Sequence, residues 1–180
     1  MLWFLLILAV VAVLAVMSYN NLIRLRTGLD EAWFSMDVFL KKRYDLIPNL
    51  VETVKGYALH ESTVLERLVN ARQTAVSAKS HEAVVEGNRA VTGGIRDLLA
   101  VAEAYPELKA DGRFGALQQA LSEIEGEIAN ARLYYNGTCR KFNEGIRTFP
   151  AMLLASVLRY SDSPYWNAEE NERGPVEVKF

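Results

Sequence analysis

The sequence is poor in the residues that build disulfide frameworks, metal clusters and nucleic-acid-binding surfaces. Among 180 residues there are one cysteine and two histidines, and 22 acidic side chains nearly balance 20 basic ones. One cysteine excludes an intrachain disulfide framework and a cysteine-rich zinc site. A formal net charge of −2 lacks the basic footprint of a nucleic-acid-binding domain. We therefore expect no nucleic-acid partner.

Charge is absent from the whole beginning of the chain. No charged side chain precedes Arg24, and residues 1–17 (MLWFLLILAVVAVLAVM) are apolar throughout. A helical run of 17–20 residues is about 25–30 Å long, which matches the hydrocarbon core of a bilayer. Trp3 and Tyr19 lie near its two ends, where aromatic rings favour the membrane interfaces. Residues 1–21 are therefore predicted to form a transmembrane anchor that contacts the lipid bilayer.

Two other interpretations of this segment stay open. A cleaved signal peptide normally has a basic start, a shorter apolar stretch and a small-residue cleavage site. Here no basic residue precedes the run, and Val13-Leu14-Ala15 is a marginal site. A buried core helix is disfavoured because the segment has no polar face. Arg24 and Arg26 directly follow the span, and basic flanks stay in the cytoplasm, so the predicted topology is single-pass with the N-terminus outside.

Prolines rarely interrupt the rest of the chain. The five prolines are Pro48, Pro106, Pro150, Pro164 and Pro175. Apolar residues recur at helical spacings of 3 and 4 in the stretches 22–39, 50–75, 84–105 and 114–149, and no strict alternation indicates a strand. The sequence thus predicts an all-α fold in which the transmembrane helix continues into an antiparallel, up-down four-helix bundle over residues 20–158.

The predicted connections carry residues typical of helix ends. Pro48 follows Asp45 and suits the first turn of a new helix, so a break is predicted before it. Ser80 is the expected N-cap of the third helix and Asp111 that of the fourth. The segment 161–180 has two prolines, no apolar period and an excess of acidic residues, which predicts a disordered acidic tail.

No catalytic, cofactor-binding or metal-binding residue is predicted. His60 and His81 lack the Glu-x-x-His spacing of di-metal helix bundles. Three glutamates spaced by two residues are spread around a helix and are interpreted as a solvated face: Glu123, Glu125 and Glu127. Cys139 lies on an apolar step and is interpreted as a small buried hydrophobic residue. The protein is therefore predicted not to be an enzyme.

The basic run Lys41-Lys42-Arg43 has two interpretations. It can contact anionic lipid headgroups, or it can place positive charge favourably at a helix C-terminus. On an upright helix the run is about 30 Å from the span, whereas the Debye length is ~8 Å. The distance favours the second interpretation.

Asn20, Asn136 and Asn143 each directly follow an aromatic residue. Asn136 and Asn143 are seven residues apart and share one face of a helix. Buried amides fix the register between helices at some cost in stability, and we expect this structural role here. The alternative is a ligand site, which would need further converging polar groups.

Several strings resemble the bacterial LemA family. They are Tyr19-Asn20, Glu31-Ala32-Trp33, the block 40–57 (LKKRYDLIPNLVETVKGY), residues 102–109 (AEAYPELK), Ala131-Arg132 with Tyr135-Asn136, and Phe142-Asn143 with Phe149-Pro150. The resemblance covers about residues 18–155. One departure is Phe142, where the family commonly has a tyrosine.

The resemblance implies a protein of the bacterial cytoplasmic (inner) membrane with its helical bundle in the cytoplasm and no defined activity. Relatives often lie in gene neighbourhoods with membrane metalloproteases, and some belong to magnetosome membranes. This implies protein partners, a membrane protease system among them, while homo-oligomerisation stays open.

The expected function is a non-catalytic scaffold or protein-interaction role at the cytoplasmic face of the membrane, with no cofactor. Two alternatives stay open. One is a periplasmic or secreted helical protein released by signal cleavage, and the other is an enzyme with an unrecognised site.

Overall fold

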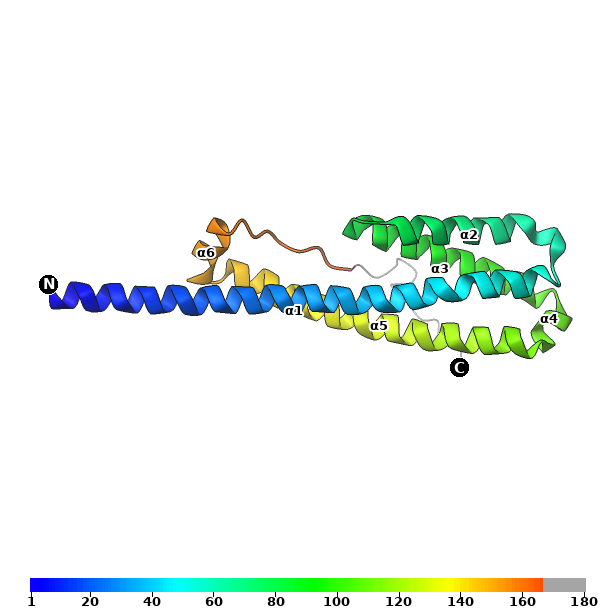
Figure 1. Ribbon diagram of the computed structural model, residues 1–180, viewed down its shortest axis with the longest axis horizontal. Helices are drawn as coiled ribbons and strands as arrows, with labels where there is room; N and C mark the ends of the chain where they lie inside the picture. Colours follow the sequence, from blue (N-terminus) through cyan, green and yellow to red (C-terminus); the bar gives the residue numbers. More distant parts are fainter. Residues whose placement is uncertain (167–180) are drawn as a thin grey trace, which may run out of the picture. The chain divides into compact units, whose positions relative to one another are not determined.

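The computed structural model describes residues 1–166, which are mostly helical. The elements are α1 (Leu2–Lys55), η1 (Leu59–Glu61), α2 (Ser62–Ser77), α3 (His81–Glu103), α4 (Pro106–Ala110), α5 (Gly112–Arg147) and α6 (Ala151–Val157) (Figure 1). No strand occurs within residues 1–166, so the predicted all-α class is confirmed. The predicted set of four helices is not confirmed, because this part of the chain also forms the short helices α4 and α6.

Helix α1 joins the apolar beginning of the chain to the folded part without a break. It contains 54 residues, from Leu2 to Lys55. By length and composition, it is the one helix in the described part of the chain that is able to cross a membrane. The side chains of its apolar window are not covered by protein. The prediction that an apolar N-terminal helix continues into the following helix is confirmed.

The predicted break before Pro48 is wrong, because α1 passes through Pro48 and ends at Lys55. A proline lacks the N–H that would bond the carbonyl four residues earlier, which here belongs to Tyr44. That carbonyl instead accepts a hydrogen bond of 2.7 Å from Nε of Arg72 on α2. Arg72 therefore supplies the donor that Pro48 lacks, and the helix continues.

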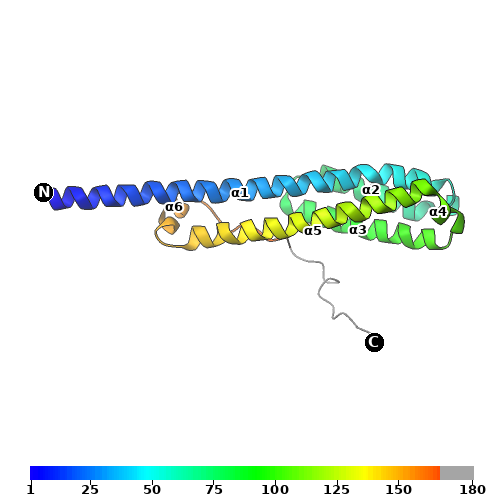
Figure 2. The same cartoon turned by 90° about the horizontal axis from the view of Figure 1, so that it is seen from below.

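The described chain forms two compact units, and the second of them covers Asp37–Ala129. Within it, α2 and α3 lie side by side (Figures 1 and 2). A Cβ added at Gly87 of α3 would lie 2.8 Å from Cα of Ala75, and one at Gly94 would lie 3.0 Å from Cδ1 of Leu68. Glycine at these two positions lets the two backbones approach closely.

The core of this second unit is made of apolar side chains at helical spacing. On α1 they continue the period found in the sequence as far as the end of the helix, and α3 and α5 contribute matching rows. The larger buried side chains are Leu40, Tyr44, Ile47, Leu50, Val54, Leu65, Leu68, Val91, Ile95, Leu98, Leu108, Phe114, Leu121 and Ile128.

Both predicted N-caps are present in the second unit. The Ser80 hydroxyl accepts a hydrogen bond from the backbone N–H of Ala83 at 3.1 Å, and Asp111 Oδ1 accepts one from the N–H of Arg113 at 2.7 Å. The Tyr57 hydroxyl also donates to Asp111, at 2.9 Å. These hydrogen bonds, with those from Arg113 the strongest, lower the pKa of Asp111 to about 2.

The first unit covers Met1–Met36 and Asn130–Trp166. In it α1 and the end of α5 run antiparallel, since the Trp33 ring lies 5.4 Å from that of Tyr135 while a Cβ at Gly145 would overlap Leu25. After a turn at residues 148–150 the chain forms α6, which lies beside α1 in both views (Figures 1 and 2).

Residues 161–166 form an extended segment that returns along α5. The disorder predicted from Ser161 onward is wrong for these residues, because side chains of α5 bind their backbone. The rest of the predicted tail, residues 167–180, lies outside the described residues.

We predict that Arg72→Met lowers the free energy of unfolding by about 1–3 kcal/mol, because the carbonyl of Tyr44 loses its donor. In a Pro48→Ala background the helix supplies its own N–H to that carbonyl, so the same substitution should cost much less. Urea unfolding of the four variants measures this coupling. Arg67→Met is the matched control, since Arg67 is exposed on the same helix, and should change stability by less than about 0.5 kcal/mol. Equal losses in both backgrounds would contradict the proposed role of Arg72.

Candidate functional site

Two asparagine side chains on α5 bind the backbone of the extended segment. The N–H of Trp166 donates to Oδ1 of Asn136 at 2.9 Å, and Nδ2 of Asn136 donates to the carbonyl of Trp166 at 3.0 Å. In the same way the N–H of Ser163 donates to Oδ1 of Asn143 at 2.8 Å, and Nδ2 of Asn143 donates to the Ser163 carbonyl at 3.0 Å. Each amide therefore binds both backbone groups of one residue. We call this pair of side chains the asparagine clamp.

The spacing of the clamp matches an extended chain. Seven helical residues separate Asn136 from Asn143, which places them about 10.5 Å apart along α5. The bound residues, Ser163 and Trp166, are three positions apart, and three extended residues cover about 10 Å. Because the spacing of the two amides equals that of the two bound residues, the amides can hold a straight segment that runs antiparallel to the helix.

Two further α5 side chains donate to carbonyls of the same segment. The Tyr135 hydroxyl donates to the carbonyl of Pro164 at 2.9 Å, and Sγ of Cys139 lies 3.1 Å from the carbonyl of Ser163. Burial raises the pKa of the Tyr135 hydroxyl and that of the Cys139 thiol, although a hydrogen bond from Asn143 acts against the second shift. Both groups are therefore protonated at neutral pH and available as donors.

The two ends of the segment are held by side-chain contacts. Trp166 is 3% exposed, and its ring lies 5.9 Å from that of Trp33 on α1. At the other end Asp162 forms an ion pair with Arg147, near the end of α5. Both members of this pair are exposed, so it contributes less than the buried tryptophan. The aromatic anchor and the asparagine clamp together fix the position of the segment.

The structure changes the predicted role of the asparagines. Asn136 and Asn143 do share one face of α5, but their amides bind an extended segment and not a neighbouring helix. Asn143 is buried, Asn136 is half-buried, and Asn20 is exposed on α1, so Asn20 does not have the buried position expected of a register-setting amide. Pro48 lies inside α1 and not at a helix start.

A second polar cluster lies in the core of the second unit around Arg43, which is 1% exposed. Its guanidinium donates to Oδ1 of Asn88 and to Oγ1 of Thr92 on α3, both at 3.0 Å, and forms an ion pair of 2.5 Å with Glu125 on α5. The cluster links three helices through one cation. Its geometry indicates a structural role, since the planar guanidinium satisfies several acceptors at once.

These contacts correct two predictions. The run Lys41-Lys42-Arg43 does not lie at a helix C-terminus, the interpretation that the distance argument favoured, because α1 continues to Lys55. Arg43 is also buried, which excludes it from the alternative lipid-binding surface, whereas Lys41 and Lys42 are exposed. Glu125 is not part of a purely solvated face, because it pairs with Arg43. A signal was present in the sequence: Arg43 continues the spacing of 3 and 4 through Met36, Leu40 and Ile47, which identifies it as a core position.

The histidines are not brought together. His60 is exposed in η1. His81 begins α3, and partial burial lowers the pKa of its imidazole. Within residues 1–166 there is no group of three or more His, Cys, Asp or Glu side chains that could hold a metal ion.

The fold and the site define an α-helical protein with one N-terminal helix able to span a membrane and an asparagine clamp near the other end of the described chain. The model of the LemA family matches residues 32–180, and the chain belongs to the LemA family. The resemblance seen in the sequence strings is thereby confirmed.

Similar proteins also include magnetosome proteins. Magnetosome protein MamQ 2 and Magnetosome protein MamQ 1 of Paramagnetospirillum magneticum are each 22% identical to this chain over 198 residues, covering 94% of it and 73% of the relative. Magnetosome protein MamQ of Magnetospirillum gryphiswaldense is 18% identical over 186 residues, covering 89% of this chain and 68% of the relative. Together with the apolar helix, these similarities support a membrane-associated helical protein.

We expect Asn143→Leu to reduce stability by about 1–3 kcal/mol, because the N–H and C=O of Ser163 each lose a partner. The substitution should lower the midpoint of thermal unfolding and make residues 161–166 sensitive to protease. In a chain that ends after Tyr160 it should cost little, since the bound segment is gone. Asn130→Leu is the control, because Asn130 is exposed on the same helix. Unchanged melting together with continued protease protection would show that the clamp does not hold the segment.

We expect Arg43→Met to cost about 2–3 kcal/mol, because Asn88, Thr92 and Glu125 lose their shared donor. The loss should be smaller than for a fully buried ion pair, since the side chain of Glu125 is 46% exposed. Arg43→Lys keeps the charge but reaches fewer acceptors, so its cost should be intermediate. Urea unfolding measures both, with the exposed Lys41→Met as control. A loss for Arg43→Met no larger than for that control would contradict the structural role.

Proposed function

We propose that this LemA-family protein is a non-catalytic scaffold anchored in the bacterial cytoplasmic membrane, with its helical part on the cytoplasmic side. In this proposal residues 1–21 cross the bilayer once with the N-terminus outside. The folded helices then bind other proteins at the membrane surface. Protein partners, among them the membrane protease system implied by the family resemblance, are part of the same proposal.

The observation that carries the proposal is the continuity of α1. The helix passes from uncovered apolar side chains into a buried core row with no linker between them. Uncovered apolar residues over a whole helical segment are unfavourable in water and favourable in lipid. The same continuity speaks against signal cleavage, because a cut after Ala15 would fall inside a regular helix.

The inside location of the folded part rests on charge. Arg24 and Arg26 are both exposed on α1 just after the apolar segment. Basic residues within this distance of a span favour the cytoplasmic side, and Asp30, which pairs with Arg26 at 3.1 Å, adds little to that preference.

The interaction role is supported by the asparagine clamp. It binds a peptide segment through backbone N–H and C=O groups, which every residue except proline offers. Recognition of an extended backbone is a general mode of peptide binding, in which side-chain pockets add specificity. The names of the similar magnetosome proteins fit a membrane setting for such contacts.

Topology reporters fused after Phe180 test the proposal. A reporter active only outside the cytoplasm should be silent, and a fluorescent reporter that folds in the cytoplasm should be bright. Arg24→Glu with Arg26→Glu, combined with lysines added before Leu2, should shift the population toward the inverted topology. The reverse reporter pattern in the unmodified chain would refute the cytoplasmic location.

The matched control for this test changes charge elsewhere. Arg67→Glu with Arg140→Glu, combined with the same number of lysines inserted after Arg67, alters two exposed arginines far along the chain from the span and changes the net charge as the test variant does. This variant should keep the original reporter pattern. Inversion by the control as well would mean that total charge, and not the flank of the span, sets the topology.

A further inference from the structure

Helix α6 has an unusual distribution of side chains. The residues that it turns toward the rest of the first unit are Ala151 and Ala155, which are 8% and 2% exposed. Larger apolar side chains face away from the protein: Phe149 (73% exposed), Met152 (46%), Leu153 (59%) and Val157 (77%). Met152, Leu153 and Val157 share one face of α6, and Phe149 precedes the helix in the turn at residues 148–150. The outer face of α6 is therefore more hydrophobic than its inner face.

The segment around α6 is also free of charge. Residues 148–158 (TFPAMLLASVL) contain no ionisable side chain, and Arg147 and Arg159 flank them on the two sides. A short apolar run between two basic residues is typical of a segment that lies in a membrane interface with its cations at the headgroups.

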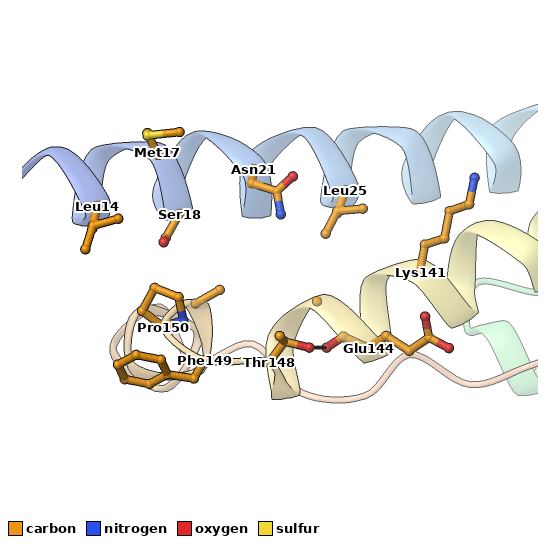
Figure 3. A pocket seen from close by; sticks show the side chains of 12 residues that line it. Leu14, Met17, Ser18, Asn21, Leu25, Lys141, Glu144, Thr148, Phe149 and Pro150 are labelled. Carbon is orange, nitrogen blue, oxygen red and sulfur yellow. Dashed lines mark hydrogen bonds between the residues drawn. The ribbon is translucent and has the colours of Figure 1, made fainter.

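A groove lies between α1 and the end of α5 with the turn that precedes α6, and Ala151 is the α6 residue in its lining. The groove has a volume of about 530 Å³. Figure 3 shows Leu14 and Ser18 projecting from α1 toward Phe149 and Pro150, which come directly before α6. The part of α1 nearest to α6 is thus the end of the apolar segment, with Leu14 and Met17 in the lining.

The depth of this contact can be estimated along α1. Leu14 and Met17 precede residue 21, the predicted end of the span, by about 6–10 Å of helix. Amphipathic helices that lie in a membrane interface bury their apolar face by about 5–10 Å. The position of α6 beside the span therefore agrees with the depth of an interfacial helix.

The backbone at the end of α6 is suited to this environment. The N–H of Tyr160 donates to the carbonyl of Ala155 at 2.9 Å, and the N–H of Arg159 donates to the carbonyl of Ser156 at 3.1 Å. Arg159 has a φ of 55°, which completes a Schellman motif. The carbonyls of Ala155 and Ser156 are thus satisfied within the chain, as a segment in contact with lipid requires.

We infer that α6 and Phe149 form a second membrane contact, which lies in the bilayer interface next to the end of the span. Its occupant is lipid: the exposed Phe149 lines the same groove as Leu14 and Met17 of the predicted span, and lipid already surrounds those residues in the proposed function. The inference rests on that proposed anchoring. It goes beyond it because it assigns lipid contact to residues far from the span in the sequence.

Depth-dependent quenching on the full chain tests this contact. Cys139→Ser removes the native thiol and keeps a donor to the Ser163 carbonyl, and single cysteines are then introduced by Leu153→Cys, Leu8→Cys and Leu133→Cys. Each is labelled with an environment-sensitive NBD fluorophore in vesicles of phosphatidylcholine containing phosphatidylglycerol. The quenchers are nitroxide-bearing lipids and aqueous iodide. Leu133 is the matched control, since it is 72% exposed on α5 in the same unit.

The label at position 153 should be quenched by lipid nitroxides within about twofold of the label at position 8, and protected from iodide. The label at position 133 should show the opposite pattern. If position 8 is quenched by lipid while position 153 responds to iodide like position 133, the inference about α6 is wrong and the anchor stands. If position 8 itself escapes lipid quenching, the proposed anchor fails.

Another occupant of the α6 face gives a different result. A second copy of the chain or a segment of this chain would shield position 153 from both quenchers, and that outcome would overturn the lipid contact. A further check combines Leu153→Asp with Val157→Cys, so that the fluorophore is attached at position 157. A charge on this face should reduce the lipid quenching of that label several-fold, because a charged side chain resists burial in the interface. Unchanged quenching would also overturn the inference.

Discussion

A backbone N–H or C=O that leaves water must find a hydrogen-bond partner, and three places within residues 1–166 show how the fold supplies one where regular helical bonding does not. At Pro48 the carbonyl of Tyr44 is satisfied by Arg72 from another helix. In the extended segment the side-chain amides of Asn136 and Asn143 serve as partners of the backbone groups. At the end of α6 the partners of the helix carbonyls are the backbone N–H groups of Arg159 and Tyr160, which follow the helix. Each departure from a regular helix exists because one specific partner is in reach.

The apolar period of the sequence predicts the parts of the structure that depend on burial alone. It identifies the all-α class, the long α3 and α5, and the continuation of the apolar N-terminal helix into the folded part, and short-range capping rules identify Ser80 and Asp111. These features are determined within a few residues of sequence, since a helix period and a cap are local. For the same reason they were open to prediction.

The features that the sequence did not predict depend on partners that are distant along the chain. Proline rules end a helix at Pro48, and nothing near it indicates that Arg72 on another helix will bind the freed carbonyl. The composition of residues 161–166 by itself predicts disorder. The side chains that stabilise this segment lie on α5, and the local composition does not reveal them. The spacing of Asn136 and Asn143 correctly indicated a shared face, but an amide can pair with a helix, a ligand or a strand, and spacing alone does not choose among them.

The asparagine clamp sets a simple rule for which sequences can occupy it. Within the described segment, residues 163 and 166 donate their N–H groups to the amides, so a proline is excluded at these two positions. A proline is allowed at position 164, and Pro164 occurs there. The side chains of Pro164 and Tyr165 are exposed, so the clamp leaves their identity free. The segment can therefore change its composition at these positions during evolution, or be rewritten by design, while its path along α5 stays the same.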